Sequence, residues 1–211
     1  MLRDTACRTL SALRIAEEAV ASLNWTVLAM CALSAVLAPS LEAAGAEKAD
    51  SVNPKVSQMQ GFTVVGIAGR TSNAKEMTPE GIIGKFWGRL MQDNLLKRIP
   101  NRADENIIAV YTDYASDHNG DYTYVLGAKV TQESEIPAGM VATKVASGKY
   151  ADFMSERGQA SRVVPEIWRK INGLPSRVPG GDRTYRSDFE IYDQRARNPQ
   201  DAIVEVFVAI R

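Results

Sequence analysis

Two segments of this chain repeat each other, and the repeat limits the folds that the chain can adopt. Residues 84–90 (GKFWGRL) resemble residues 165–171 (PEIWRKI), and both have the apolar spacing of an amphipathic helix. A strand pattern with a tyrosine near an aspartate follows each helix, at residues 109–113 and 190–193. Each half is therefore predicted to run strand, helix, strand, strand. Two such copies are too few for a stacked array and predict a duplicated α+β domain with pseudo-twofold symmetry.

The individual elements follow from local patterns. Thr78 and Pro79 are typical of a helix start, and Gly173 is typical of a helix end. The predicted helices cover residues 78–96 and 163–172, and the predicted strands cover 62–70, 106–113, 122–130, 140–153 with a break at 147–148, 187–193 and 203–210. The arrangement that follows is an antiparallel sheet with two helices flanking a central groove.

The first 46 residues resemble a targeting sequence more than a fold. Arginines precede an apolar run at residues 25–38, and small residues at 44–46 offer a cleavage site. Glu17 and Glu18 are atypical of a signal peptide, so a disordered extension or a later start stays open. The protein is exported to the periplasm if the leader is a signal peptide and is cytoplasmic otherwise. Residues 47–60 are predicted to be a linker, and residues 61–211 the domain.

Composition argues against several classes of function. Lys plus Arg and Asp plus Glu each total 25, so no basic excess is present to bind a phosphate backbone, and direct nucleic-acid binding is not expected. The two cysteines, Cys7 and Cys31, lie in the extension, and His118 is the single histidine. We therefore expect no metal site and no cofactor. The spacing of Asp117 to Asp121 superficially suggests a calcium loop, but Asn119-Gly120 favours a hairpin turn.

The strand at residues 187–193 carries the main functional signal. Side chains alternate between the two faces of a strand, so Phe189 and Ile191 point one way and Glu190 and Tyr192 the other. A carboxylate that faces only apolar neighbours is costly. The cost disappears if that face borders a groove where a cation can sit.

The repeat also predicts which residues occupy equivalent positions. Glu190 corresponds to Ala109, and Tyr192 corresponds to Tyr111. One half offers a carboxylate where the other offers a methyl group. A duplicated scaffold specialised for one ligand would show this asymmetry.

Together these stretches resemble the GyrI-like effector-binding domain family, also called the AraC-type or bacterial transcription activator effector-binding domain. The resemblance covers roughly residues 60–211, and its matching stretches are residues 62–73, 107–114 with 117–127, 146–153 and 188–193. The chain is most similar to stand-alone members, including members that bind cationic drugs and are carried on integron cassettes.

The resemblance implies a two-repeat α+β fold whose groove takes amphipathic, often cationic, small molecules. The family's acidic residue on the penultimate strand matches Glu190, and the expected aromatic walls are Tyr111, Tyr192, Trp87 and Trp168. Many relatives are fused to a helix-turn-helix DNA reader, which residues 1–60 do not resemble. The expected partner is a hydrophobic or cationic small molecule. No stable membrane span is expected in the mature chain, and a homodimer stays open.

A purely structural role is the alternative to ligand binding for each of these residues. The tryptophans and tyrosines are also typical of plain core packing. Glu190 could instead form an ion pair with Arg186 or Lys149. Asp113 and Asp193 are expected to form turns.

Three functions remain open, and binding is favoured over catalysis. The first is a binding module with Glu190 as counter-ion. The alternative is a GyrI-like hydrolase of strained electrophilic compounds, as the resemblance implies, with Glu190 as general base and Tyr111 or Tyr192 as proton donor. A third is binding to a protein partner, as in relatives that inhibit topoisomerase.

Overall fold

The computed structural model describes residues 54–132 and 135–211. The predicted leader and its two cysteines lie outside the described residues. The elements are β1 Lys55–Met59, β2 Phe62–Thr71, α1 Asn73–Glu76, α2 Ile83–Gln92, α3 Leu95–Arg98, β3 Ile107–Thr112, β4 Tyr122–Val130, β5 Val141–Val145, β6 Gly148–Met154, α4 Ala160–Asn172, β7 Arg177–Val178, β8 Gly181–Asp182, β9 Ser187–Tyr192, the 3-10 helix η1 Gln194–Ala196 and β10 Glu205–Ile210.

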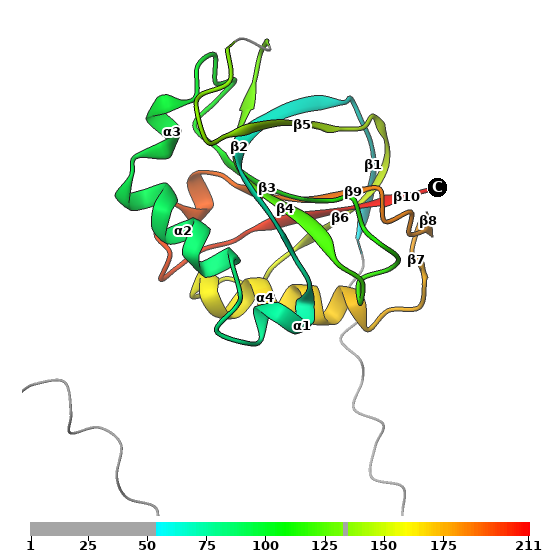
Figure 1. The fold of residues 1–211 in the computed structure, drawn as a ribbon. Helices are drawn as coiled ribbons and strands as arrows, with labels where there is room; N and C mark the ends of the chain where they lie inside the picture. Colours follow the sequence, from blue (N-terminus) through cyan, green and yellow to red (C-terminus); the bar gives the residue numbers. More distant parts are fainter. Residues whose placement is uncertain (1–53, 133–134) are drawn as a thin grey trace, which may run out of the picture. The chain divides into compact units, whose positions relative to one another are not determined.

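The main sheet has eight strands in the order β1-β6-β10-β9-β3-β4-β2-β5, and every neighbouring pair is antiparallel. The sheet curls strongly, so β5 and β2 arch over the central strands (Figure 1). These features confirm the predicted α+β class and antiparallel sheet.

The strand order is the order that two copies of one unit would produce around a twofold axis between β3 and β9. Strands β4 and β10, which the repeat predicts to be equivalent, flank this central pair, and β2 and β6 lie next to them. Ala109 lies directly opposite Glu190, the residue with which the sequence repeat aligns it. Arg102 and Arg183 also make matching bridges, to Val130 and Ile210. The duplication itself stays a prediction.

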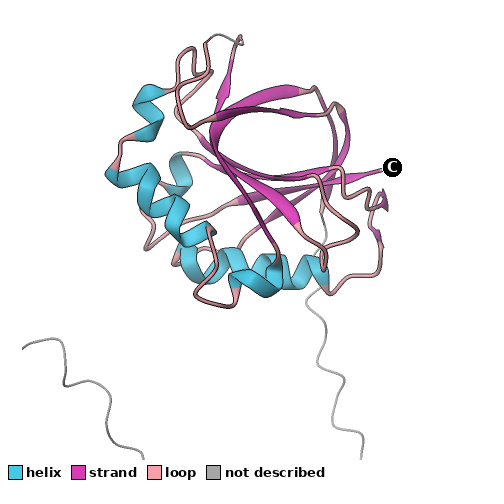
Figure 2. Cartoon of the chain, in the orientation of Figure 1, coloured by secondary structure: helices cyan, strands magenta, loops and turns pink. Residues whose placement is uncertain are grey.

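The helices lie on one face of the sheet (Figure 2). Under α2 and α4, apolar side chains of the two helices pack on the outward-facing residues of the central strands. The other face lies inside the curl and is filled by a separate cluster around Val64, Val110, Tyr150, Phe189 and Phe207. Phe189 and Glu190 therefore face opposite sides, as the alternation predicts.

The linker prediction is wrong for residues 55–59, because this stretch forms edge strand β1. Its backbone pairs with β6, from Lys55 opposite Asp152 to Met59 opposite Gly148. Most of its side chains are exposed. A polar edge strand of this kind lacks the apolar pattern by which strands are recognised in sequence.

The predicted single helix over residues 78–96 is also wrong. Ser72 caps the short helix α1, and Thr78 lies in the turn that follows. Helix α2 begins at Ile83, because the Glu76 carboxylate accepts hydrogen bonds from the backbone N–H groups of Ile82 (2.9 Å) and Ile83 (3.1 Å). Asn94, at φ 50°, separates α2 from α3.

The second half agrees better with the sequence. Helix α4 ends at Asn172, and Gly173 follows as predicted. Strands β3 and β4 pair as predicted, although a nine-residue loop joins them and Asn119-Gly120 forms only its last turn.

Candidate functional site

Glu190 lies at the centre of β9, and its side chain is 1% exposed. Oε1 accepts a hydrogen bond from the Tyr111 hydroxyl at 2.7 Å and another from Trp168 Nε1 at 2.5 Å. Oε2 accepts one from the Tyr192 hydroxyl at 2.8 Å. All three donors are neutral. They come from β3, α4 and β9, so only the folded chain brings them together.

Burial raises the pKa of the Glu190 carboxyl, and the hydrogen bonds from Trp168, Tyr111 and Tyr192 oppose this rise. The same surroundings raise the pKa of the Tyr111 and Tyr192 hydroxyls, first through burial and then through the charge of Glu190. Both tyrosines therefore stay protonated and act as hydrogen-bond donors at neutral pH.

The two predicted tryptophans pack against the two predicted tyrosines. The Trp168 ring meets the Tyr111 ring edge-to-face at 4.9 Å, and the Trp87 ring meets the Tyr192 ring in the same way at 4.7 Å. Each contact joins the helix of one half to a strand of the other half. The structure thus brings all five predicted site residues together.

The ion pair that competed for Glu190 does not form. Arg186 donates to the carbonyl oxygen of Ser147, and within residues 54–132 and 135–211 Glu190 makes no ion pair. Trp87, Trp168 and Tyr192 remain partly exposed, whereas Tyr111 and Glu190 are buried. The aromatic side chains therefore cover the carboxylate, and some of them also reach the surface.

A second buried carboxylate, which the sequence analysis missed, lies two residues away on β9. Asp188 is 0% exposed, and its Oδ2 pairs with Arg183 at 3.0 Å and accepts from the Tyr114 hydroxyl at 3.1 Å. Its Oδ1 accepts from the backbone N–H of Ala209 at 2.9 Å. The alternation of β9 places Asp188 on the same face as Glu190, so a signal was present in the sequence.

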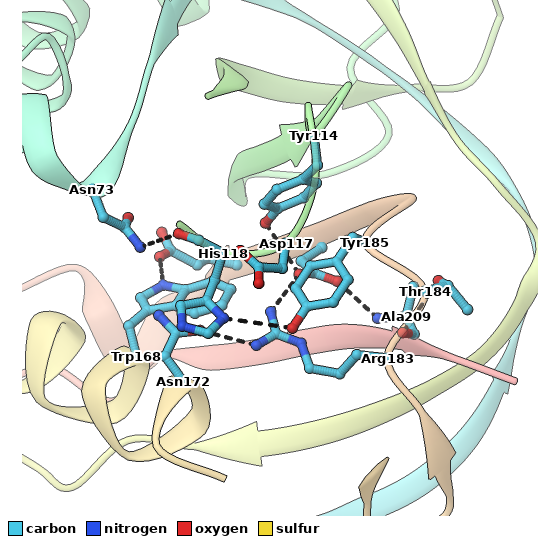
Figure 3. Close-up of polar contacts among 12 residues, drawn as sticks. Asn73, Tyr114, Asp117, His118, Trp168, Asn172, Arg183, Thr184, Tyr185 and Ala209 are labelled. Atoms are coloured by element: carbon cyan, nitrogen blue, oxygen red, sulfur yellow. Dashed lines mark hydrogen bonds and ion pairs between the residues drawn. The ribbon is translucent and has the colours of Figure 1, made fainter. Parts of the chain in front are cut away.

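Figure 3 shows this network between α4 and the segment that leads into β9. Arg183 also donates to Asn172 Oδ1 at 2.9 Å and lies over the Tyr185 ring at 4.5 Å. The Tyr185 hydroxyl lies 3.5 Å from His118 Nδ1. His118 is therefore partly buried against this network.

Other tyrosines widen the aromatic frame, and the sequence analysis did not select them. Tyr124 on β4 packs edge-to-face on Tyr111 at 5.2 Å, and Tyr122 lies 5.4 Å from the same ring. The Tyr122 hydroxyl donates to Asn73 Oδ1 at 3.1 Å. Side chains alternate along β4, so Tyr122 and Tyr124 lie on the same face of the sheet as Tyr111. This alternation could have identified both tyrosines from the sequence.

The described part of the chain holds no group of three His, Cys, Asp or Glu residues that could bind a metal ion. Asp117 accepts from the backbone N–H of Asn119, and Asp121 pairs with Lys75. Asp193 caps η1, and Asp113 has a φ of 50°. Across residues 54–132 and 135–211, no helix has the length and apolar character needed to cross a membrane.

This chain is similar in sequence to a protein family and to two regulators named below. The sequence model of the family described as Cass2, integron-associated effector binding protein, matches residues 55–210. The putative transcriptional regulator YobU of Bacillus subtilis (strain 168) is 35% identical over 147 residues, which cover 69% of this chain and 90% of YobU. The transcriptional regulator BrlR of Pseudomonas aeruginosa is 28% identical over 162 residues, which cover 76% of this chain but only 56% of BrlR.

Solved structures share the fold. The integron cassette protein VCH_CASS2 of Vibrio cholerae is 30% identical, with a TM-score of 0.60 over 75% of this chain and 96% of its own. SAV2435 bound to tetraphenylphosphonium also has a TM-score of 0.60, at 17% identity, over 75% of this chain and 93% of its own. At that identity the likeness to SAV2435 concerns the fold alone.

Proposed function

The chain belongs to the family of integron-associated effector-binding proteins, and from this premise we propose that it binds amphipathic cations against Glu190. In this proposal Glu190 is the counter-ion, and Tyr111, Tyr192, Trp87 and Trp168 form the walls. No chemical step is required of these residues.

The contrast between Asp188 and Glu190 carries the proposal. Both carboxylates are on one face of β9, and neither is more than 1% exposed. Asp188 has the Arg183 guanidinium at 3.0 Å, whereas Glu190 is surrounded by neutral hydroxyl and indole donors. A buried charge without a counter-ion is costly, and of these two carboxylates Asp188 alone has a cation among the described residues. A bound cation would supply the counter-ion that Glu190 lacks.

The walls suit a cation with apolar substituents. An aromatic face attracts a nearby cation by about 0.5–2 kcal/mol. Each of the wall side chains named above contacts Glu190 or a tyrosine that is hydrogen-bonded to it. SAV2435, which shares the fold, was solved with the lipophilic cation tetraphenylphosphonium. Tetraphenylphosphonium is therefore a suitable first probe.

Access to Glu190 requires an aromatic wall to move, since the carboxylate is covered. Trp87 and Trp168 are the wall residues on helices, and both are partly exposed. We expect a ligand to displace at least one of them. Because tryptophan emission responds to such a change, the ligand can be followed directly.

The test is a fluorescence titration of the full chain with tetraphenylphosphonium. We expect saturable quenching, and we expect Glu190→Gln to weaken binding at least about tenfold, because the variant removes the buried charge and keeps the shape. The control is Glu166→Gln, which removes a carboxylate that pairs with Arg162 on the surface of α4. Equal affinity in wild type and Glu190→Gln, or equal weakening by both variants, would overturn the proposal.

The hydrolase alternative has one specific observation in its favour. The Tyr111 hydroxyl lies 2.7 Å from Glu190 Oε1, and burial raises the pKa of the Glu190 carboxyl, as a general base requires. Incubation with neutral strained electrophiles separates the two functions. Product that forms with the wild type and not with Glu190→Gln would favour the hydrolase. The absence of direct nucleic-acid binding and the homodimer stay predictions.

A further inference from the structure

The Tyr124 hydroxyl is a buried polar group without a partner. Tyr124 is 0% exposed, and its hydroxyl makes no hydrogen bond of normal geometry within the described residues. Almost all buried side-chain polar atoms in native proteins have a partner, so an orphaned hydroxyl calls for an explanation. A ligand that completes the site is one such explanation.

The surroundings of Tyr124 place it in the aromatic frame of Glu190. Its ring packs edge-to-face on Tyr111, the donor to Glu190 Oε1, and lies 6.1 Å from the Phe86 ring of α2. Burial and then the charge of Glu190 raise the pKa of the Tyr124 hydroxyl, and the Trp87 indole is close enough to lower it. The orphaned hydroxyl is therefore next to the proposed cation site.

Glu190 itself has an incomplete set of hydrogen bonds. A carboxylate offers about four acceptor positions, two on each oxygen. Oε1 accepts from Tyr111 and Trp168, whereas Oε2 accepts from Tyr192 alone. One acceptor position on Oε2 stays open among the described residues.

We propose that the ligand is a protonated amine or amidinium whose N–H group donates to Glu190 Oε2 and whose polar head also contacts the Tyr124 hydroxyl. This inference rests on the proposed function and narrows it to cations that carry N–H donors. A quaternary ammonium or a phosphonium would meet the charge of Glu190 but would leave Oε2 and Tyr124 incomplete.

Trp87 is the wall through which such a ligand would enter. It packs on Tyr192, which donates to Oε2, and its indole lies close enough to the Tyr124 hydroxyl to lower the pKa of that hydroxyl. Trp168, in contrast, donates to Oε1 and would lose that bond on moving. Displacement of Trp87 would therefore uncover Tyr192 and Tyr124 and leave the hydrogen bonds of Glu190 intact.

The selectivity follows from charge-assisted hydrogen bonding. An N–H donor on a cation forms a short, strong bond to a carboxylate, and a site built for such a donor rejects the analogue that lacks it. We expect the protonated amine to bind at least about tenfold more tightly than its quaternary analogue.

The test uses two matched ligands that share one diphenylalkyl scaffold. One carries a protonated dimethylamino group, and the other carries the trimethylammonium group formed by adding one methyl. Calorimetric titration of the full chain at pH 7 should show the tenfold preference for the amine. Tyr124→Phe should reduce that preference about threefold or more, and it should fold normally because it removes an unpaired hydroxyl.

The control variant is Tyr150→Phe, which removes a buried hydroxyl that bonds to the Ala146 carbonyl on the opposite face of the sheet. It should leave the preference unchanged. Equal affinity for the two ligands, or an unchanged preference in Tyr124→Phe, overturns this inference and leaves the proposed function standing. Absence of binding by both ligands overturns this inference, and the proposed function falls with it if tetraphenylphosphonium also fails to bind.

Discussion

Ala109 lies directly opposite Glu190 on the two central strands of the sheet. Both residues are buried, and the strand order places this pair at the centre of the two halves. A glutamate at both positions would put two carboxylates together without water, where like charges repel strongly. A methyl group on one side thus leaves a single carboxylate at the centre of the sheet.

We expect Ala109→Leu to lower the stability of the fold and to prevent cation binding. The larger side chain would overpack the space beside Glu190, at a cost of about 1–3 kcal/mol. Urea unfolding measures the stability, and the fluorescence titration measures binding. Ala103→Leu, at an exposed loop position, is the control and should change neither. Unchanged binding in Ala109→Leu would show that the ligand lies elsewhere.

We expect Glu190→Gln to stabilise the protein at neutral pH but not in acid. Burial raises the pKa of Glu190 in the folded protein above its unfolded value. The stability that this group contributes is therefore full below the unfolded pKa and is lost as pH rises through the folded pKa. The glutamine has no such loss, so Glu190→Gln should be more stable than the wild type at pH 7, and the difference should vanish near pH 4. Unfolding curves at several pH values measure it, and a constant difference between the two proteins would contradict the argument.

Cation binding should strengthen as pH rises. Tetraphenylphosphonium keeps its charge at all pH values, so the titrating group is on the protein. Since the cation prefers the ionised carboxylate, affinity should increase through the raised pKa of Glu190. Titrations from pH 4 to 8 test this, with Glu190→Gln expected to give a flat profile. A wild-type profile that is equally flat would remove Glu190 as the counter-ion.

We expect Arg183→Met to destabilise the fold by about 3–5 kcal/mol, because it leaves Asp188 buried without its cation. The matched control is Arg157→Met, which breaks an exposed pair with Asp201 and should cost at most about 1 kcal/mol. Chemical denaturation measures both variants. Similar losses would mean that the buried pair has no special weight.

Local patterns in the sequence determined much of this protein. The two-residue period of a strand decided that Glu190 and Tyr192 share a face. The equivalence of Glu190 and Ala109 stays a prediction of the repeat, although the two residues lie opposite each other. The resemblance to the family selected the five site residues that the fold brings together. These features depend on the order of residues along single elements, which is why they could be predicted.

Contacts between distant segments could be decided only by the tertiary structure. Strand β1 forms because β6 offers its backbone as a partner, and α2 begins at Ile83 because Glu76 reaches its first N–H groups. The sequence likewise did not show that Arg183 pairs with Asp188, or that the Tyr124 hydroxyl has no hydrogen bond of normal geometry among the described residues. Hydrogen bonds and ion pairs form at short range, so which polar groups find a partner depends on how folding places side chains that lie far apart in the sequence.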